Sequence, residues 1–108
     1  MRQIEKQMLH AVINRNNWKK DNTEVVNEGG VISVYLHGNK IFALTSIGAM
    51  YSFAGWDTVT TRSRLRALGL PIVSKDGSRY AYGNELSTKR GDWFCTSLAD
   101  FMSYAATK

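Results

Sequence analysis

The chain has 108 residues, of which 44% are hydrophobic and 21% are charged. These values predict a single domain over residues 1–108 with its own hydrophobic core, and they exclude a disordered polyelectrolyte. Cys95 is the only cysteine, which excludes an internal disulfide and fits a reducing compartment. The N-terminus lacks the apolar run of a signal peptide, and no stretch is apolar enough for a membrane span. We therefore expect a cytoplasmic protein with no membrane partner.

The net charge of +5 is unevenly distributed. Residues 1–57 carry six Lys and Arg against five Asp and Glu, and residues 91–108 carry one against two. Residues 58–90 carry seven against two, which is a charge of 7 − 2 = +5. A local basic excess favours a polyanion or an acidic protein surface as partner. A solvated face that only promotes solubility explains the same charge equally well.

The first half of the chain predicts one helix followed by an antiparallel meander. Residues 3–15 form an amphipathic pattern, with Met8, Ala11 and Val12 on its apolar stripe. The following segments are rich in β-branched and aromatic residues and are separated by Gly and Asn turns. The predicted strands cover residues 22–26, 31–36, 41–45 and 50–53, which makes a meander of three or four strands over 23–53.

The second half predicts a helix, a hairpin and a terminal helix. Asp57 or Thr58 can cap a helix that runs to residue 68, where Gly69 and then Pro71 end it. Residues 72–74 and 79–82 flank an Asp-Gly pair, which is typical of a β-hairpin. Residues 84–91 are polar and predict a loop, and the apolar spacing in 92–106 predicts a C-terminal helix. The expected fold is α+β, with N-terminal, central and C-terminal helices packed on an antiparallel sheet.

Residues that commonly carry catalysis or bind metals are scarce. The two histidines and one cysteine do not have the spacing of a zinc site. The two glycine-rich motifs that bind phosphates, G-x-x-x-x-G-K-[ST] and G-x-G-x-x-G, are both absent from the sequence. Cys95 and His37 are a conceivable nucleophile–base pair, but a buried Cys95 and a solvent-exposed turn residue His37 are the simpler expectations. The nine carboxylates are scattered and suggest no acid–base pair. We therefore expect a non-enzymatic protein without metal or cofactor.

Three arginines alternate along the predicted central helix. Arg62 and Arg66 are four residues apart and share a face, whereas Arg64 lies about 200° from Arg62 around the axis. The arginines therefore border an apolar stripe on both sides and do not form one basic face. Their stems can cover the stripe while their heads reach water. In the functional interpretation, Arg62 and Arg66 bind phosphates, assisted by Lys75 and Arg79 on the hairpin.

The three tryptophans, Trp18, Trp56 and Trp93, lie beside polar or charged residues. In a domain of this size we expect them to complete the core. A tryptophan that stacks on single-stranded bases needs an exposed ring in a basic groove. Trp56 fits this alternative best because it adjoins the basic segment, and Trp93, which follows Lys89 and Arg90, fits it second best.

Several of these segments resemble small accessory proteins of tailed bacteriophages. The resemblance rests on the opening Ile-Glu-Lys-Gln-Met at 4–8 with Asn-Thr at 22–23, on Tyr-Leu-His-Gly-Asn at 35–39, and on the Trp, Thr, Ser, Arg, Leu and Gly pattern of 56–69. It covers about two thirds of the chain and carries no known activity. It implies a phage protein that acts in the bacterial cytoplasm, where such proteins often bind and disable host factors.

A second resemblance concerns residues 62–82. This stretch is similar to the helix and wing of mercury-resistance-type transcription regulators, in which a helix ending in Gly-Leu leads to a glycine-containing hairpin. Gly69, Leu70, Gly77, Arg79 and Tyr80 match that pattern. The helix-turn-helix that precedes it in those regulators has no counterpart here, because 40–53 is predicted to form strands.

Two hypotheses for a partner follow. The first is a phage-type accessory protein that contacts nucleic acid through residues 58–90. The alternative is an inhibitor that binds an acidic surface of a host protein, such as a defence or nucleic-acid-processing factor. For either partner the candidate contact residues are the basic side chains of this segment and one adjoining aromatic: Arg62, Arg64, Arg66, Lys75, Arg79, Lys89, Arg90 and Trp56.

Overall fold

The computed structural model describes residues 1–105, which fold into three helices and nine strands. In chain order these elements are α1 (Gln3–Ile13), β1 (Trp18–Lys20), β2 (Thr23–Glu28), β3 (Val31–Leu36), β4 (Asn39–Leu44), β5 (Gly48–Tyr51), α2 (Val59–Ala67), β6 (Val73–Lys75), β7 (Ser78–Ala81), β8 (Asn84–Leu86), β9 (Phe94–Ser97) and α3 (Leu98–Ala105).

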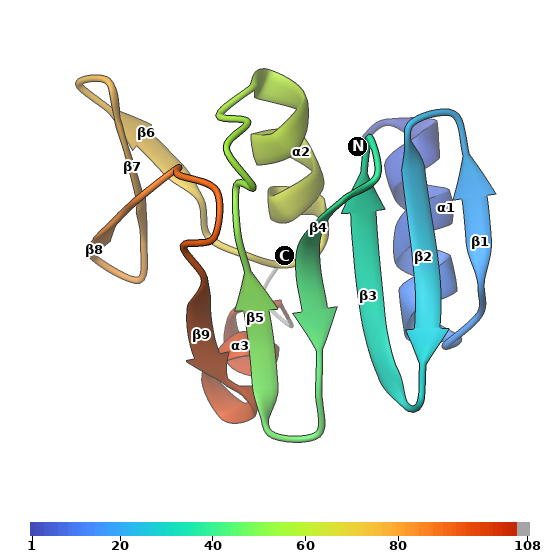
Figure 1. Cartoon of the computed structure of the whole chain (residues 1–108). Coiled ribbons are helices and arrows are strands. Elements are labelled where there is room, and N and C mark those ends of the chain that lie inside the picture. The colour runs from blue at the N-terminus through green and yellow to red at the C-terminus, as the bar shows by residue number, and fades with distance from the viewer. Residues whose placement is uncertain (106–108) are drawn as a thin grey trace.

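The strands form two antiparallel sheets. The larger has the order β1-β2-β3-β4-β5-β9, and the smaller has the order β6-β7-β8 (Figure 1). The predicted meander is β2 to β5, and the predicted hairpin is β6 with β7. The three helices pack on the large sheet through contacts of α1 with β2, α2 with β4 and α3 with β5. The expected α+β fold is therefore confirmed.

Local turn chemistry explains the hairpins. His37 and Gly38 between β3 and β4 both have positive φ, at 52° and 79°. Asp76 and Gly77 between β6 and β7 do the same, at 51° and 80°. Two successive residues with positive φ are typical of the type I′ turn, whose twist matches that of the paired strands. The structure also places a bulge in β4 at Ile41, where the register with β3 shifts between Val34 and Tyr35.

Helix α2 begins and ends where its sequence predicts. The Thr58 hydroxyl accepts a hydrogen bond from the Thr61 backbone N–H at 3.1 Å, which caps the first turn. Gly69 has a φ of 106° just beyond the helix, a conformation that suits glycine. Helix α1 ends at Ile13, two residues earlier than expected, and its buried stripe contains Met8, as predicted.

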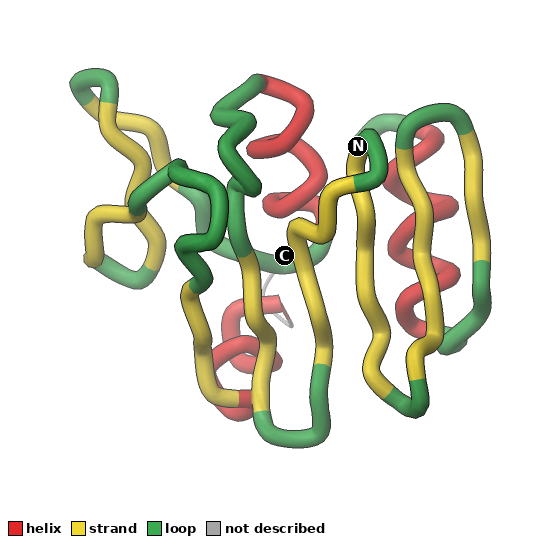
Figure 2. The backbone as a smooth tube through the Cα atoms, in the orientation of Figure 1, coloured by secondary structure: helices red, strands yellow, loops and turns green. Residues whose placement is uncertain are grey.

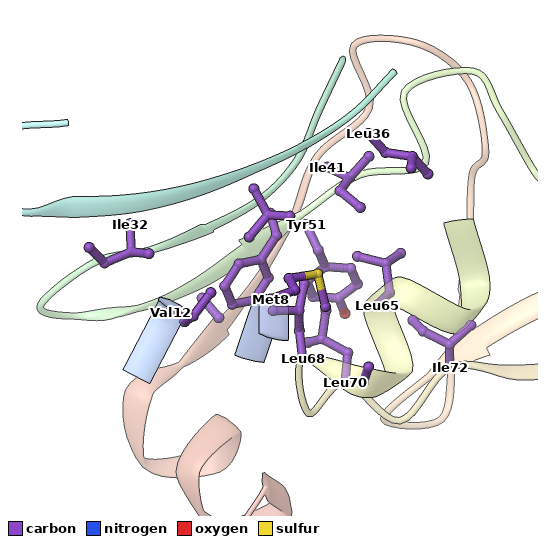
Figure 3. Packing of buried hydrophobic residues seen from close by; sticks show 14 of the residues in the cluster. Met8, Val12, Ile32, Leu36, Ile41, Tyr51, Leu65, Leu68, Leu70 and Ile72 are labelled. Carbon is purple, nitrogen blue, oxygen red and sulfur yellow. The ribbon is translucent and has the colours of Figure 1, made fainter. Parts of the chain in front are cut away.

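The core lies between the large sheet and the helices. Met8 of α1, Leu65 of α2 and Leu68, which directly follows α2, converge near Tyr51 of β5 (Figure 3). Phe101 of α3 packs against Phe42 of β4, with ring centroids 5.9 Å apart. Each of the three helices therefore buries apolar side chains against the sheet, and such burial is the main stabilising contribution to a domain of this kind.

Three segments differ from the sequence-based predictions. Residues 18–20 form the edge strand β1, and 84–86 form β8 inside a predicted loop; Figure 2 shows both as strands. Residues 94–97 form β9, where a helix was predicted, and only the part from Leu98 onward is helical. Hydrogen bonding to β5 and the contact of Phe94 with Tyr51, at 5.8 Å between centroids, favour the strand. Such long-range pairing overrides a helical spacing that is only local.

Candidate functional site

The loop between β5 and α2 holds Trp56 at the surface. Ala54 and Gly55 have positive φ, at 55° and 82°, and the Trp56 N–H donates to the Phe53 carbonyl at 2.8 Å. The Ser52 hydroxyl accepts from the Ala54 N–H at 3.0 Å. This tight turn leaves Trp56 55% exposed. The expectation that Trp56 completes the core is wrong, because the turn directs its ring away from the buried cluster.

The segment 87–92 lies against this loop. The Gly55 N–H donates to the Thr88 carbonyl at 3.1 Å, and a β-carbon placed on Gly55 would lie 3.4 Å from the Arg90 β-carbon. The Arg90 guanidinium donates to the Asn39 side-chain oxygen at 3.4 Å, which links this segment to the tip of the β3–β4 hairpin. Lys89 and Arg90 are both exposed. The predicted Trp56, Lys89 and Arg90 are thus brought to one end of the molecule.

Two further predicted arginines share one carboxylate at this end. Arg62 of α2 and Arg79 of β7 bind the same Asp57 oxygen, at 2.7 and 3.0 Å. Burial raises the pKa of Asp57, but the hydrogen bonds and charges of Arg79 and Arg62 lower it more, so that it lies below its usual value. Asp57 therefore stays ionised at neutral pH and holds both guanidinium groups at the position that follows Trp56 in the chain.

A hollow of about 210 Å³ opens between the hairpin tip and the start of α2. Its floor is apolar and buried, and its rim carries hydrogen-bonding side chains and the Trp56 ring. The residues that line it are Leu36, His37, Asn39, Ile41, Phe53, Ala54, Trp56, Thr58, Thr60 and Thr61. We call Trp56, which lines this hollow, together with the four cationic residues linked to its loop, Arg62, Arg79, Lys89 and Arg90, the loop surface.

The other three candidate residues lie elsewhere. Arg64 is only 3% exposed and pairs with the buried Glu5 of α1 at 2.8 Å. Arg66 is half-buried, and its Nε donates to the Ile72 carbonyl at 2.8 Å. Lys75 faces the side of the β6–β7 hairpin opposite to Arg79, because it is paired with Ser78. The four residues that were predicted to bind phosphates together, Arg62, Arg66, Lys75 and Arg79, therefore do not lie on one surface.

The structure agrees with some of the remaining predictions, which concern two tryptophans, one cysteine and one histidine, and differs from the others. Trp18 packs against the core as expected. Trp93 is 36% exposed, which contradicts the prediction that it is buried. Cys95 of β9 is exposed, although a buried side chain was expected. β9 is an edge strand, and the Cys95 side chain points to the face of the sheet opposite to the core face, on which Phe94 lies. His37 is exposed in its turn, as predicted.

The described part of the chain has neither a metal-binding cluster nor a membrane-spanning helix. In residues 1–105, no group of three or more His, Cys, Asp or Glu side chains is arranged to hold a metal ion. Over the same residues, no helix is both long and apolar enough to cross a membrane.

Two residues that position the loop surface were not singled out from the sequence. Asn39 has no distinguishing signal, because its role depends on the approach of Arg90, which is 51 positions away in the chain. The sequence indicates Asp57 only as a possible helix cap, and in the structure Thr58 caps the helix. The available signal was the position of Asp57 just before the first turn of the helix that carries Arg62.

Comparisons with known proteins now identify the family. The comparison with curated proteins gives no significant match, and that with solved structures gives none. The similarity of 62–82 to mercury-resistance regulators is not supported, and β4 and β5 occupy the place of the helix-turn-helix. A family model described as Kyanoviridae Gp96 protein matches residues 1–106. The predicted resemblance to phage proteins is thereby confirmed, and the chain belongs to the Kyanoviridae Gp96 family of phage proteins.

Proposed function

We propose that this phage protein is a non-enzymatic accessory protein that contacts nucleic acid through the loop surface, in the cytoplasm of the infected bacterium. The observation that carries the proposal is the exposed Trp56 ring in a loop whose Asp57 binds two arginines, Arg62 and Arg79, and whose Gly55 bonds to the segment that carries Lys89 and Arg90. Arginine and lysine bind phosphates, and an exposed aromatic ring offers a stacking surface for bases.

The charge of the loop surface sets the expected strength of binding. The loop surface has four cationic side chains, and the Asp57 carboxylate offsets one of them. The net charge of these four cations and Asp57 is therefore 4 − 1 = +3. If all four cations displace counterions from duplex DNA, the logarithm of the binding constant falls with a slope of about −3.6 against the logarithm of salt concentration. Raising the salt from about 50 to 200 mM should then weaken binding roughly a hundredfold.

A second candidate function is inhibition of a host protein through an acidic surface. The observation that favours it is the pair of exposed apolar side chains beside the arginines: Trp56 and Val59, the latter 63% exposed. Tryptophan and arginine are enriched among the residues that dominate protein–protein binding energy. Asp57 also reduces the local positive potential, which matters less for a protein partner than for a polyanion.

The decisive experiment is a fluorescence-polarisation titration of random-sequence DNA and RNA across a salt series. The variant Lys89→Gln/Arg90→Gln removes two charges from the loop surface. Its matched control, Lys19→Gln/Lys20→Gln, removes two charges from β1, at the opposite edge of the large sheet. We expect the first variant to weaken binding and to flatten the salt dependence, and the control to change both much less.

The outcomes separate the two functions. Absence of binding to DNA and RNA at low salt would reject the nucleic-acid function. Equal weakening by both variants would show that binding depends on total charge and not on the loop surface. A pull-down from nuclease-treated bacterial lysate, repeated with Trp56→Ala, would then test the host-protein function. A captured protein that is lost with this variant supports it.

A further inference from the structure

The hollow beside Trp56 has the composition of a site for a planar aromatic group. Its floor is formed by side chains that are less than a tenth exposed: Leu36, Ile41, Phe53 and Ala54. Its rim presents an imidazole, an amide and hydroxyl groups, from His37, Asn39, Thr58 and Thr60. An apolar cleft with a few converging polar groups is the usual form of a small-molecule site in proteins.

The size of the hollow limits what it can hold. Sites for drug-sized ligands measure about 300–1,000 Å³, and this hollow measures about 210 Å³. It therefore suits one ring system of a larger ligand, while the rest of that ligand remains outside. A phosphate attached to such a ring would lie at the rim, where Arg90 approaches Asn39.

We propose that the hollow receives one unstacked base of a single-stranded nucleic acid, with the Trp56 ring against the base and the Arg90 guanidinium on a neighbouring phosphate. The proposal rests on the proposed function and adds the class of nucleic acid. In a duplex each base is stacked on both faces and paired along its edge, so only a single strand presents a base that can enter without the energy of flipping.

The walls of the hollow are fixed before any ligand binds. The Asn39–Arg90 hydrogen bond joins the hairpin tip to segment 87–92, and the Gly55–Thr88 hydrogen bond joins that segment to the Trp56 loop. Ala54, in the floor, has a φ of 55°, a strained conformation for a residue with a β-carbon. Strain of this kind persists where the surrounding structure enforces it, and it is frequent at ligand-binding sites.

The test compares three fluorescein-labelled probes at equal nucleotide length: an oligothymidylate, an abasic strand of the same charge, and a blunt-ended duplex of two strands with no loop. Stacking of one base on an aromatic ring corresponds to about a 5- to 150-fold change in affinity. We expect Trp56→Ala to weaken oligothymidylate binding within this range and to leave abasic-strand and duplex binding nearly unchanged. Trp93→Ala, which removes another exposed tryptophan, is the matched control and should change none of the three.

A second variant tests the hollow without removing the ring. Thr60→Met adds volume at the rim with no change in charge, and Thr60 is half-buried at the start of α2, so the fold should tolerate it. It should weaken oligothymidylate binding selectively. Equal affinity for all three probes, or unaltered oligothymidylate binding in both Trp56→Ala and Thr60→Met, would overturn the inference while the proposed function stands. Absence of binding to every probe at low salt would instead reject the proposed function itself.

Discussion

The ion pair between Arg64 and Glu5 joins helices α1 and α2 inside the protein. Both residues are about 3% exposed, and Arg64 also donates to the Thr23 hydroxyl of β2 at 3.1 Å. Ser63 donates to the same Glu5 oxygen that Arg64 binds. In the variant Arg64→Met, the apolar stem is largely retained, but the buried Glu5 carboxylate loses the guanidinium group that neutralises it.

Removing one partner of a buried ion pair costs about 3–5 kcal/mol, because the other charge is left buried without compensation. In a domain of this size each kcal/mol corresponds to a shift of about 4 °C or more in Tm. Arg64→Met should therefore lower Tm by at least about 3 × 4 = 12 °C. The matched control is Arg62→Met on the same helix. Its pair with Asp57 is partly exposed, at 15% and 27% of the two side chains, so we expect a loss of about 1 kcal/mol or less.

Urea unfolding followed by circular dichroism measures these losses. Glu5→Leu and the double variant Glu5→Leu/Arg64→Met complete a double-mutant cycle. The double variant should be destabilised by less than the sum of the single variants, since an apolar pair leaves no isolated charge. Additive losses, or a loss for Arg64→Met no larger than that for Arg62→Met, would refute the conclusion that this pair is energetically buried.

The same pair predicts a dependence on pH. Burial raises the pKa of Glu5. Hydrogen bonds from Ser63 and Arg64 and the charge of Arg64 together lower this pKa by more than burial raises it, so that it lies below its usual 4.5. A carboxylate with a lowered folded-state pKa contributes stability above its unfolded pKa and loses that contribution as the pH falls through the folded pKa. Below about pH 4.5, unfolding free energy should decrease more steeply in the parent protein than in Glu5→Gln. Parallel curves would contradict this assignment.

Three further predictions concern backbone approach, helix capping and cysteine exposure. In Gly48→Ala the new β-carbon would lie 2.2 Å from the Thr96 carbonyl oxygen, so β5 and β9 must separate. We expect a loss of about 1–3 kcal/mol in unfolding free energy, measured in a thermal melt. An unchanged Tm would show that the two strands do not approach so closely. Thr58→Ala should cost about 1 kcal/mol in urea unfolding and Thr58→Ser much less, because serine also caps; equal losses would argue against the cap. Cys95 should react with a thiol reagent in the folded protein nearly as fast as in urea, and strong protection would contradict its exposure.

Local sequence patterns predict much of this fold. The β-branched run that forms β3, the positive-φ turns at His37–Gly38 and Asp76–Gly77, and the capped helix α2 follow from preferences that act within a few residues. These signals also locate most of the meander and the central hairpin. They suffice for the α+β class because neighbouring antiparallel strands need only short connections.

The short edge strands needed information from distant parts of the chain. Phe94 and Leu98 are four residues apart and fit a helix, but Phe94 belongs to β9 and faces Tyr51, while Leu98 begins α3. The Leu98 N–H donates to the Ile47 carbonyl, some 50 positions earlier, at the point where the strand changes to helix. The change from strand to helix depends on the free edge of β5, with which β9 pairs. The spacing of apolar residues within 92–106 contains no information about that edge.

The sequence by itself determined the charge excess of 58–90 and the presence of Trp56 beside it. Only the tertiary structure decided which of those charges reach one surface. Arg64 is buried because α2 presents it to Glu5, whereas Arg79, Lys89 and Arg90 join Trp56 because β7 and segment 87–92 pack around the β5–α2 loop. The physical reason is that residue type sets charge and local conformation, but burial and pairing depend on contacts between segments far apart in the chain.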